Sequence, residues 1–386
     1  MIAKIQVRND TAANWTSANP TLLVGEVGYE TDTKKKKMGD GVTAWNSLEY
    51  NMLQASDLND DDTVVKTTVD GVELFVGKSV GEMRALLGYI SGTSFIFVKG
   101  EGTATENATE LQTAYTLAKT MTPFGAALSA TNRMTIVVSP GKYTFGVAKF
   151  AVDTQYIDIV SLTGNLDIVL DGINVTANDV FLKGIDCGTD VFTIATDLNL
   201  LKCDTCTGGE SSFGCSSGGV LVSASGTFTN CTGGDLSFGG LNGTASGTFT
   251  DCTGGNHSFG GQNGTASGTF TDCTGGNYSF GGQSGTASGT FTDCIGGESS
   301  FGGYGGIASG TFTDCTSGDY SFGGGIGTAS GTFTNCTGGE LSFGYIGTLT
   351  GKLYWCRMTS GTFQTVSGSG QTRMCLDGTN VLNNQG

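Results

Sequence analysis

The sequence is poor in the features that usually mark catalysis, cofactor binding or membrane insertion. Its 386 residues include one histidine and three prolines, and only 14% are charged. No stretch matches a Walker loop, a dinucleotide-binding fingerprint in a βαβ context or an HExxH motif. No run approaches the roughly 18 apolar residues of a membrane span, and the amino terminus lacks an apolar leader core. The sequence therefore predicts a soluble chain, made in a cytoplasm, with no cofactor and no membrane insertion.

Basic residues are scarce as well. The chain has 19 Lys and Arg against 35 Asp and Glu, which gives a formal net charge of −16. A chain of this charge repels phosphate backbones instead of recruiting them. We therefore expect no nucleic-acid partner.

What the sequence does contain is a repeat of 21 residues. The motif SGTFT(D/N)C recurs from about residue 225 to residue 344. Its cysteines are Cys231, Cys252, Cys273, Cys294, Cys315 and Cys336. A unit this short cannot bury its own apolar side chains and must stack on its neighbours, so the period predicts a solenoid. The 65 glycines follow no three-residue period, which excludes collagen.

Alternation within each unit predicts which side chains face inward. In ASGTFT, apolar and hydroxylated residues alternate with the period of a strand, and a second short run, xSFG, also resembles a strand. Coils stacked about 4.8 Å apart would place equivalent residues above one another. The expected structural ladders are those of the six repeat cysteines, of the xSFG phenylalanines, and of Phe249, Phe270, Phe291 and Phe312.

The cysteines are expected to be free thiols in the core. Stacked equivalents repeat near 4.8 Å, whereas a disulfide needs Cβ atoms about 3.8 Å apart. Only Cys203 and Cys206 have CxxC spacing, and His257 is the sole histidine, so a four-ligand zinc site is not expected. The sequence contains no GGxGxD-type repeat that could bind calcium. We therefore predict no metal, and thiols that pack as small hydrophobes.

Two further rows lie outside the predicted core. Asn or Asp precedes each repeat cysteine, as at Asp251, where a structural turn is expected. Five residues after each cysteine the residue type varies, which is typical either of tolerated surface or of a ligand-binding face. This candidate surface-binding row, called the variable row below, comprises Leu236, His257, Tyr278, Ser299, Tyr320 and Leu341.

The rest of the chain divides into distinct segments. Residues 1–50 hold two of the three tryptophans and several turn signals between short β-rich runs, which predicts a small all-β module. The lysine run 34–37 falls in an expected hairpin connection and is predicted to be solvated. Residues 51–93 are expected to form a neck or linker, with a hairpin about Asp70 and Gly71.

Residues 94–375 are predicted to form the whole solenoid, a parallel β-helix built from Val/Ile-rich runs followed by the repeats. An amphipathic helix near its start has Ala108, Leu111, Tyr115 and Ala118 on one face. Thr103 and Glu106 fit a capping box, and we expect this helix to cover the open end of the first coil. Residues 376–386 are expected to be a polar carboxy-terminal tail.

Two stretches resemble known families. Residues 25–48, GEVGYETDTKKKKMGDGVTAWNSL, resemble the amino-terminal module of bacteriophage tail-fibre and major-tropism-determinant-like proteins. That resemblance implies a β-prism-like trimer that binds other virion proteins. The run TIVVSPGKYTF and the coils after it resemble pectin-lyase-like right-handed β-helices, which implies an all-β, right-handed solenoid.

The resemblances together predict a structural virion fibre or spike that attaches to a host-surface glycan or protein. A head-decorating fibre is an open alternative to a tail fibre. A polysaccharide depolymerase is the other alternative, with paired carboxylates drawn from residues such as Asp272 and Asp293. The equivalence of these carboxylates argues against it, because glycoside cleavage needs two different environments.

Overall fold

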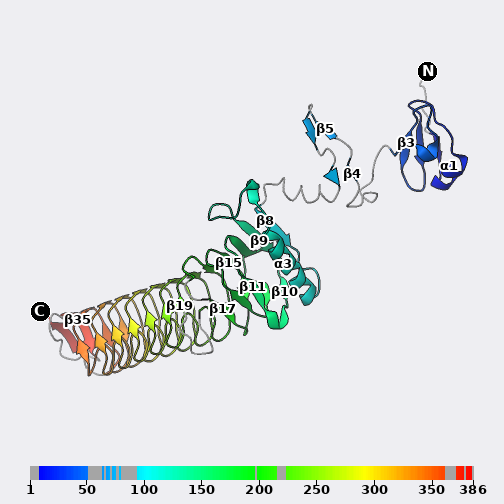
Figure 1. Ribbon diagram of the computed structural model, residues 1–386. Coiled ribbons are helices and arrows are strands. Elements are labelled where there is room, and N and C mark those ends of the chain that lie inside the picture. Colours follow the sequence, from blue (N-terminus) through cyan, green and yellow to red (C-terminus); the bar gives the residue numbers. More distant parts are fainter. Residues whose placement is uncertain are drawn as a thin grey trace, which may run out of the picture. The chain divides into compact units, whose positions relative to one another are not determined.

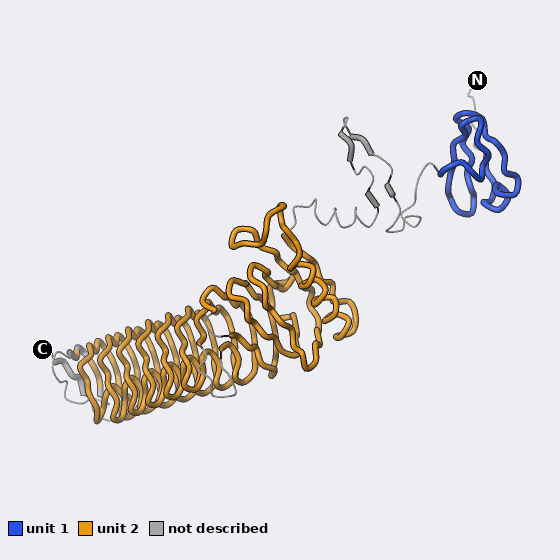
Figure 2. Tube along the Cα trace, viewed as in Figure 1, with its two compact units in different colours: residues 1–92 blue, residues 93–386 orange. Residues whose placement is uncertain are grey.

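The computed structural model describes residues 8–50, short strands within 63–79, and residues 94–384 except 196–197, 215–222, 361–370 and 378–379. The chain forms two compact units, residues 1–92 and 93–386 (Figure 2). The two units are described separately below.

The amino-terminal unit has a three-stranded sheet and a short helix. The sheet pairs β1 (Arg8–Asp10) parallel to β2 (Val27–Glu30), and β2 antiparallel to β3 (Lys36–Met38). The small sheet was expected, but helix α1 (Ala12–Ala18) and the 3-10 turn η1 (Trp45–Ser47) were not. Thr11 caps α1 by accepting a hydrogen bond from the Asn14 N–H, which satisfies one of its free amide groups. The prediction of an all-β module was therefore wrong in this detail.

Two tryptophans form the core of this unit. The rings of Trp15 and Trp45 stack with centroids 4.1 Å apart, and Leu22 is buried beside them. Gly28 is required next to this stack, because a Cβ there would lie 2.4 Å from the Trp45 ring. The core thus explains why so polar a helix forms: α1 supplies Trp15 to the stack.

The lysine run is only partly solvated, contrary to the prediction. Lys34 lies in the connection, but Lys37 belongs to β3 and is only 5% exposed. Its Nζ donates to the Trp45 carbonyl at 2.8 Å and lies 4.4 Å from the Tyr50 ring centroid. Alternation along β3 turns this one lysine inward, where aromatic faces and a carbonyl replace water.

Four short strands are described between residues 63 and 79. β5 (Thr67–Val69) pairs antiparallel with β6 (Val72–Leu74), which confirms the hairpin expected about residues 70–71. β4 (Thr63–Val64) pairs antiparallel with β7 (Lys78–Ser79). The remainder of the predicted neck lies outside the described residues.

The second unit is the predicted parallel β-solenoid (Figure 1). Its main sheet has 16 strands and begins with edge strand β8 (Phe95–Val98), which pairs with β9. The strands of the first coils are β9 (Met134–Val138), β10 (Gly141–Tyr143), β11 (Phe150–Val152), β12 (Ile157–Ser161), β13 (Ile168–Leu170), β14 (Ile173–Val175), β15 (Phe181–Lys183), β16 (Ile185–Asp186), β17 (Phe192–Ile194) and β18 (Lys202–Asp204). Short 3-10 turns, η3 (Pro123–Gly125) and η4 (Gly146–Ala148), interrupt the connections.

Helix α3 (Ala104–Ala118) lies beside β8, β9 and β10 at one end of the solenoid (Figure 1). The predicted capping box is present, with Thr103 and Glu106 bonded reciprocally. The predicted face is buried and joins the solenoid core, as shown by Leu111 and Tyr115, both fully buried. The Tyr115 hydroxyl accepts from the Asp153 and Thr154 amides at 2.9 Å. The helix is therefore fixed to the coil below it, as expected of a lid.

Each repeat contributes two short strands in register with the neighbouring coils. The TFT strands continue the main sheet, and Phe228 pairs with Phe249, which pairs with Phe270. They are β20 (Thr227–Thr229), β22 (Thr248–Thr250), β24 (Thr269–Thr271), β26 (Thr290–Thr292), β28 (Thr311–Thr313) and β30 (Thr332–Thr334). A second, seven-stranded sheet holds β19 (Ser223–Ala224), β21 (Thr244–Ala245), β23 (Thr265–Ala266), β25 (Thr286–Ala287), β27 (Ile307–Ala308), β29 (Thr328–Ala329) and β32 (Thr348–Leu349).

The xSFG run is a turn, not the strand that the sequence predicted. In the first repeat Leu236, Phe238 and Gly239 have φ angles of 60°, 51° and 87°. Residues with left-handed backbone angles cannot continue a strand, so the chain changes direction there. The phenylalanine side chain still points into the core. The same conformation recurs at the equivalent phenylalanines of the following coils, such as Phe259 and Phe280.

The predicted aromatic ladders are present and contact each other. Consecutive rings of one ladder are nearly parallel, as for Phe249 and Phe270 with centroids 4.9 Å apart. Rings of the other ladder meet them edge to face, as for Phe259 and Phe270 at 5.9 Å. Stacked and edge-to-face pairs are both favourable aromatic geometries. Rings inside the ladders, such as Phe270, thus have aromatic neighbours above, below and beside them.

The carboxy-terminal coils depart from the repeat. Phe333 pairs with Leu353, only 20 residues later, in β33 (Lys352–Tyr354). β31 (Thr337–Gly338) pairs with β34 (Arg357–Met358), and β35 (Gln371–Asp377) pairs with both β33 and β34. The expected polar tail includes a strand, β36 (Asn380–Asn384), which pairs antiparallel with β35. An antiparallel final strand occupies a sheet edge that would otherwise be open.

Candidate functional site

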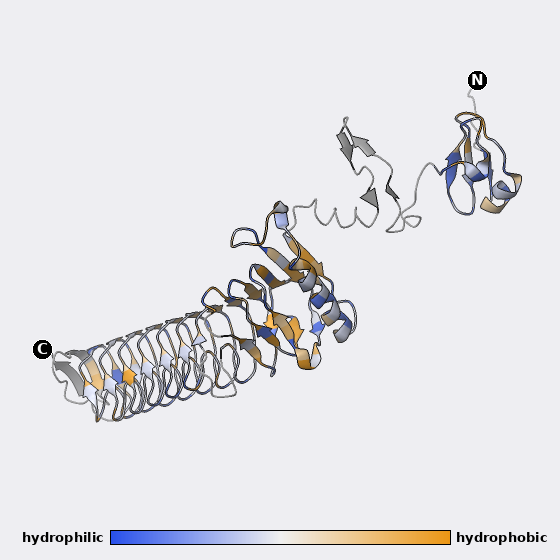
Figure 3. Cartoon of the chain, in the orientation of Figure 1, coloured by the Kyte–Doolittle hydropathy of each residue, from blue (hydrophilic) through white to orange (hydrophobic). Residues whose placement is uncertain are grey.

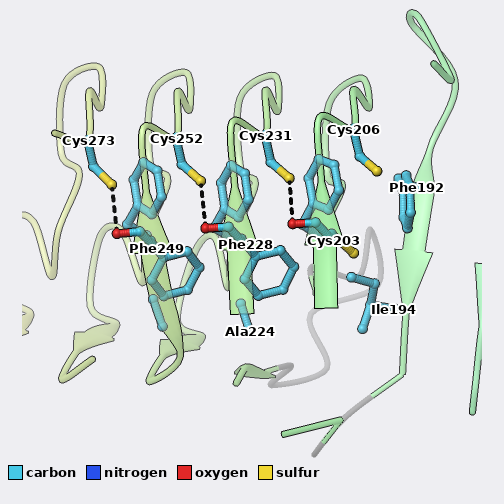
Figure 4. Close-up of a cluster of buried hydrophobic side chains, with 14 of the residues drawn as sticks. Phe192, Ile194, Cys203, Cys206, Ala224, Phe228, Cys231, Phe249, Cys252 and Cys273 are labelled. Carbon is cyan, nitrogen blue, oxygen red and sulfur yellow. Dashed lines mark hydrogen bonds between the residues drawn. The ribbon is translucent and has the colours of Figure 1, made fainter. Parts of the chain in front are cut away.

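The cysteine ladder lies inside the solenoid and its thiols contact backbone carbonyls. The Cys252 thiol donates to the Phe228 carbonyl on the preceding coil at 3.4 Å, and Cys273 donates to Phe249 at the same distance. Figure 4 shows the thiols directed at the neighbouring coil in this way. All eleven cysteines within the described residues are buried and free. The predicted free-thiol ladder is therefore confirmed there.

Burial raises the pKa of thiols in and beside the ladder. It raises the pKa of the Cys231 thiol, and it raises that of Cys356, one coil beyond the six repeat cysteines, to about 12. A thiol in an apolar environment loses more by ionising than it would in water. The ladder therefore packs the core of the solenoid.

The described part of the chain shows no cluster of three or more His, Cys, Asp or Glu side chains that could hold a metal ion. Within the same residues, no helix combines the length and the apolar character that a bilayer crossing requires.

The Asn and Asp residues before the cysteines occupy left-handed turn positions. Asp251, Asp272 and Asp293 have φ angles of 52°, 53° and 52°, and all are exposed. Asn and Asp tolerate this conformation better than other residues with a Cβ. The predicted turn ladder is present. Asp251, Asp272 and Asp293 stand in equivalent turns, while Asp314 accepts a hydrogen bond from the Asn335 side chain.

A second ladder of side chains runs four residues after the cysteines. The Oδ1 atom of Asp235 accepts from the Asn256 N–H at 2.7 Å, and Asn256 Oδ1 accepts from Asn277 N–H at 2.9 Å. Asp319 holds Glu340 N–H in the same way at 2.6 Å. These side chains satisfy amides that the turn leaves without a partner in the sheets.

The variable row follows this ladder directly, at half-buried, left-handed positions. The His257 and Tyr278 rings stack with centroids 5.0 Å apart and an interplanar angle of 10°. Burial lowers the pKa of His257, so its ring is neutral at pH 7. Ser299 is almost fully buried, unlike the other members of the row. The row is therefore a continuous edge of the solenoid with changing side chains.

A third row, ten residues after each of the first five repeat cysteines, was missed by the sequence analysis. Its members are Leu241, Gln262, Gln283, Tyr304 and Gly325. Gln262 Nε2 donates to Gln283 Oε1 at 3.0 Å, and the Tyr304 ring meets Tyr320 edge-on with centroids 5.8 Å apart. The sequence could have revealed this row, because its residue type varies within an otherwise fixed repeat. This tenth-position row lies beside the variable row where Tyr304 meets Tyr320.

An apolar groove of about 540 Å³ lies between α3 and edge strand β8. Its lining includes Ile96, Phe97 and Leu117, with Glu106 and Glu110 among the polar residues. Phe97 and Leu117 are about half exposed. The sequence predicted the helix but gave no indication of this groove.

The amino-terminal unit also contains a buried polar network beside its Trp stack. Tyr50 donates to Glu30 Oε1 at 2.7 Å, and Glu30 is almost fully buried. Burial lowers the pKa of Lys37, and the charge of Glu30 opposes that shift. Thr33 also donates to the Glu30 carboxylate. These contacts fix β2 and β3 against η1 without leaving the buried charges unpaired.

Comparison with known proteins identifies this unit. Residues 5–43 match the family described as the Major tropism determinant N-terminal domain. The match confirms the resemblance seen in residues 25–48. No curated protein and no solved structure gives a significant match to the chain. The chain thus joins a domain of the major tropism determinant amino-terminal family to a parallel β-solenoid, and this combination fits a phage tropism or fibre protein.

Proposed function

We propose that this chain is a virion fibre or spike whose amino-terminal domain binds the particle and whose solenoid attaches to a host surface. The observation that carries the proposal is the family match at residues 5–43, followed by a solenoid of repeated coils. A rigid repeat can present one surface several times along its axis, which suits adhesion.

The proposal assigns no reaction to the chain. Asp272 and Asp293 stand in equivalent turns, whereas the two carboxyls of a glycosidase occupy different environments. Host attachment therefore needs only the outer rows of the repeat, with the thiols and phenylalanines committed to the core.

Binding of the purified full-length chain to host cells tests the attachment. We expect labelled protein to bind the cells and to compete with phage adsorption. Absence of both effects would contradict the proposal. Release of soluble oligosaccharides from the cell surface, lost in Asp272→Asn or Asp293→Asn, would instead favour a depolymerase.

We further propose a homotrimer assembled through residues 1–50. Light scattering of the full chain should give three times the chain mass, and a chain of residues 51–386 should give a smaller assembly. A monomeric full-length protein would refute this part. Labelling the amino terminus on intact particles would then distinguish a tail fibre from a head fibre.

A further inference from the structure

We propose that the solenoid edge at Tyr304 binds a neutral saccharide, which stacks on the exposed face of that ring. The inference rests on the proposed attachment function and names the class of receptor and the place of contact. Three observations carry it: the packing of Tyr304, the polar groups around it, and the charge of the repeat.

The Tyr304 ring is held flat against glycine. It is 40% exposed, and a Cβ on Gly325 would lie 2.4 Å from its Cδ2 atom. Any side chain at position 325 would therefore displace the ring. Tyr320 supports it from the side, edge-on at 5.8 Å. One face of Tyr304 thus rests on backbone while its position is fixed, which lowers the entropy lost on binding.

The repeat changes at two positions together to make this arrangement. In earlier coils the tenth-position row holds Gln262 and Gln283, which bond to each other. Tyr304 interrupts that amide ladder, and Gly325 follows it one coil later. The core ladders are unchanged in these coils, since Phe301, Phe312 and Phe322 remain fully buried. The change to Tyr304 therefore alters the surface and not the core, whereas Gly325, with a φ of 59°, also suits its turn.

Polar groups suited to sugar hydroxyls lie next to the ring. Tyr320 brings a phenol to the same edge, and the preceding residue, Asp319, uses Oδ1 to hold Glu340 N–H. Gln283 uses its Oε1 to accept from Gln262, so its NH₂ group remains a donor. Tyrosine among Gly, Ser and Asn combines a rigid apolar face with adaptable hydrogen bonding.

Charge decides the class of saccharide. Residues 223–351 contain no lysine or arginine, whereas Glu298, Asp319 and Glu340 form part of the row beside the variable row. An anionic capsule or a phosphorylated lipopolysaccharide core would meet only like charge there. A neutral glycan avoids this repulsion and can donate its hydroxyl protons to the carboxylates.

A protein partner fits the edge less well. A stable protein interface buries about 800 Å² on each side and centres on a cluster of large anchors. Here the ring has two exposed isoleucines near it, Ile307 and Ile326, and residues 223–351 contain no Trp or Arg. Because protein hot spots are enriched in Trp, Tyr and Arg, this edge matches a sugar ring better than a protein surface.

Binding of the full-length chain to immobilised neutral polysaccharides, a glucan, a mannan and a galactan, tests the inference. We expect one of them to bind and Tyr304→Ala to weaken that binding about tenfold or more. Gly325→Asn should weaken it as well by displacing the ring, because asparagine tolerates the φ of 59° at this position. Leu241→Ala is the matched control, because it removes an exposed side chain from the same row three coils away. Circular dichroism verifies that each variant is folded.

Three results would overturn the inference: no binding to the neutral polysaccharides, preference for an anionic one, or equal binding by Tyr304→Ala and wild type. These outcomes are separable from failure of the proposed function. If the wild-type chain binds host cells and Tyr304→Ala binds them equally, attachment stands and the saccharide site is wrong. Loss of cell binding after protease treatment of the cells would point to a protein receptor.

Discussion

The two halves of the solenoid reach the same fold with different cores. Residues 94–204 bury aliphatic side chains such as Ile136 and Ile159, and their strands are the more hydrophobic ones in Figure 3. Residues 223–360 bury ladders of Phe, Cys and Ala. Ion pairs cross between coils only in the first half of the described solenoid, as where Arg133 contacts both Asp158 and Asp179.

This difference shows that the residues that set the period of the solenoid are not the ones that fix its register. In the repeat each coil offers its neighbour the same partners, so a slip by one whole coil would restore nearly every ladder. In the first half the carboxylate partners of Arg133 lie at residues 158 and 179, and a slip would lose them. We infer that the first coils and the altered last coils fix the register, while the repeat supplies uniform stacking.

High pH should distinguish the two halves most strongly. Burial raises the pKa of the Cys356 thiol from an ordinary 9.0 to about 12. The stability that this protonated thiol contributes is therefore fully present below about pH 9, and it is lost as the pH rises toward 12. Residues 94–204 also bury two thiols, Cys187 and Cys203, and two phenols, Tyr115 and Tyr143, whose pKa values rise from 10.0 to about 12. The repeat buries a thiol in every coil and so loses more stability over this pH range.

The repeat should therefore unfold at lower pH than the aliphatic coils. Under reducing conditions, ultraviolet thiolate absorbance should appear together with loss of circular dichroism and with proteolysis inside the repeat. Thiolate absorbance that appears while the circular dichroism is unchanged would contradict the inward ladder.

Phe270→Ala should have the largest effect among single substitutions. It removes a ring stacked on Phe249 and Phe291, and we expect the free energy of unfolding to fall by about 3–5 kcal/mol. Phe291→Ala should cost the same amount, because its surroundings are equivalent. Denaturant unfolding measures both, and exposed Thr269→Ala serves as the control. Unequal costs would break the claim that coils of the repeat are interchangeable.

Arg133→Ala should destabilise the first half by about 2–3 kcal/mol. It leaves two partly buried carboxylates, Asp158 and Asp179, without their cation. Lys119→Ala, which removes a more exposed pair with Asp153, should cost less than about 1 kcal/mol. If both variants unfold at the same denaturant concentration, the ion pairs do not fix the first coils.

Asp272→Val should cost about 1–2 kcal/mol, since a β-branched side chain is strained at its φ of 53°. Asp272→Asn should stay within about 0.5 kcal/mol of wild type in the same thermal unfolding experiment. A large loss with Asn would mean that the charge, and not the turn, matters at this row.

The period alone was sufficient to predict most of the repeat. Because 21-residue stacking forces equivalence, it placed Cys252, Phe249 and the turn at Asp251 correctly. It could not show that the run ending at Phe238 is a turn, because left-handed φ angles at non-glycine residues leave no compositional signal. The inward position of the thiols followed from the same stacking argument.

Features that depend on single contacts were missed. Helix α1 is short and polar, and it forms because Trp15 stacks on Trp45, 30 residues away in sequence. Lys37 is buried for the same kind of reason, since only tertiary structure supplies the Trp45 carbonyl and the Tyr50 ring. The platform at Tyr304 likewise needs Gly325 from the next coil, a pairing that no local pattern reveals.

The in-register pairing of Phe249 with Phe270 has a consequence for how such a chain can evolve. Recombination between two copies of the repeat adds or removes a whole coil and leaves every stacking partner in place. Length then changes in steps of about 4.8 Å, the distance between neighbouring strands, with little cost to folding. The gene can therefore adjust the reach of its product in discrete increments while the units at both ends stay the same.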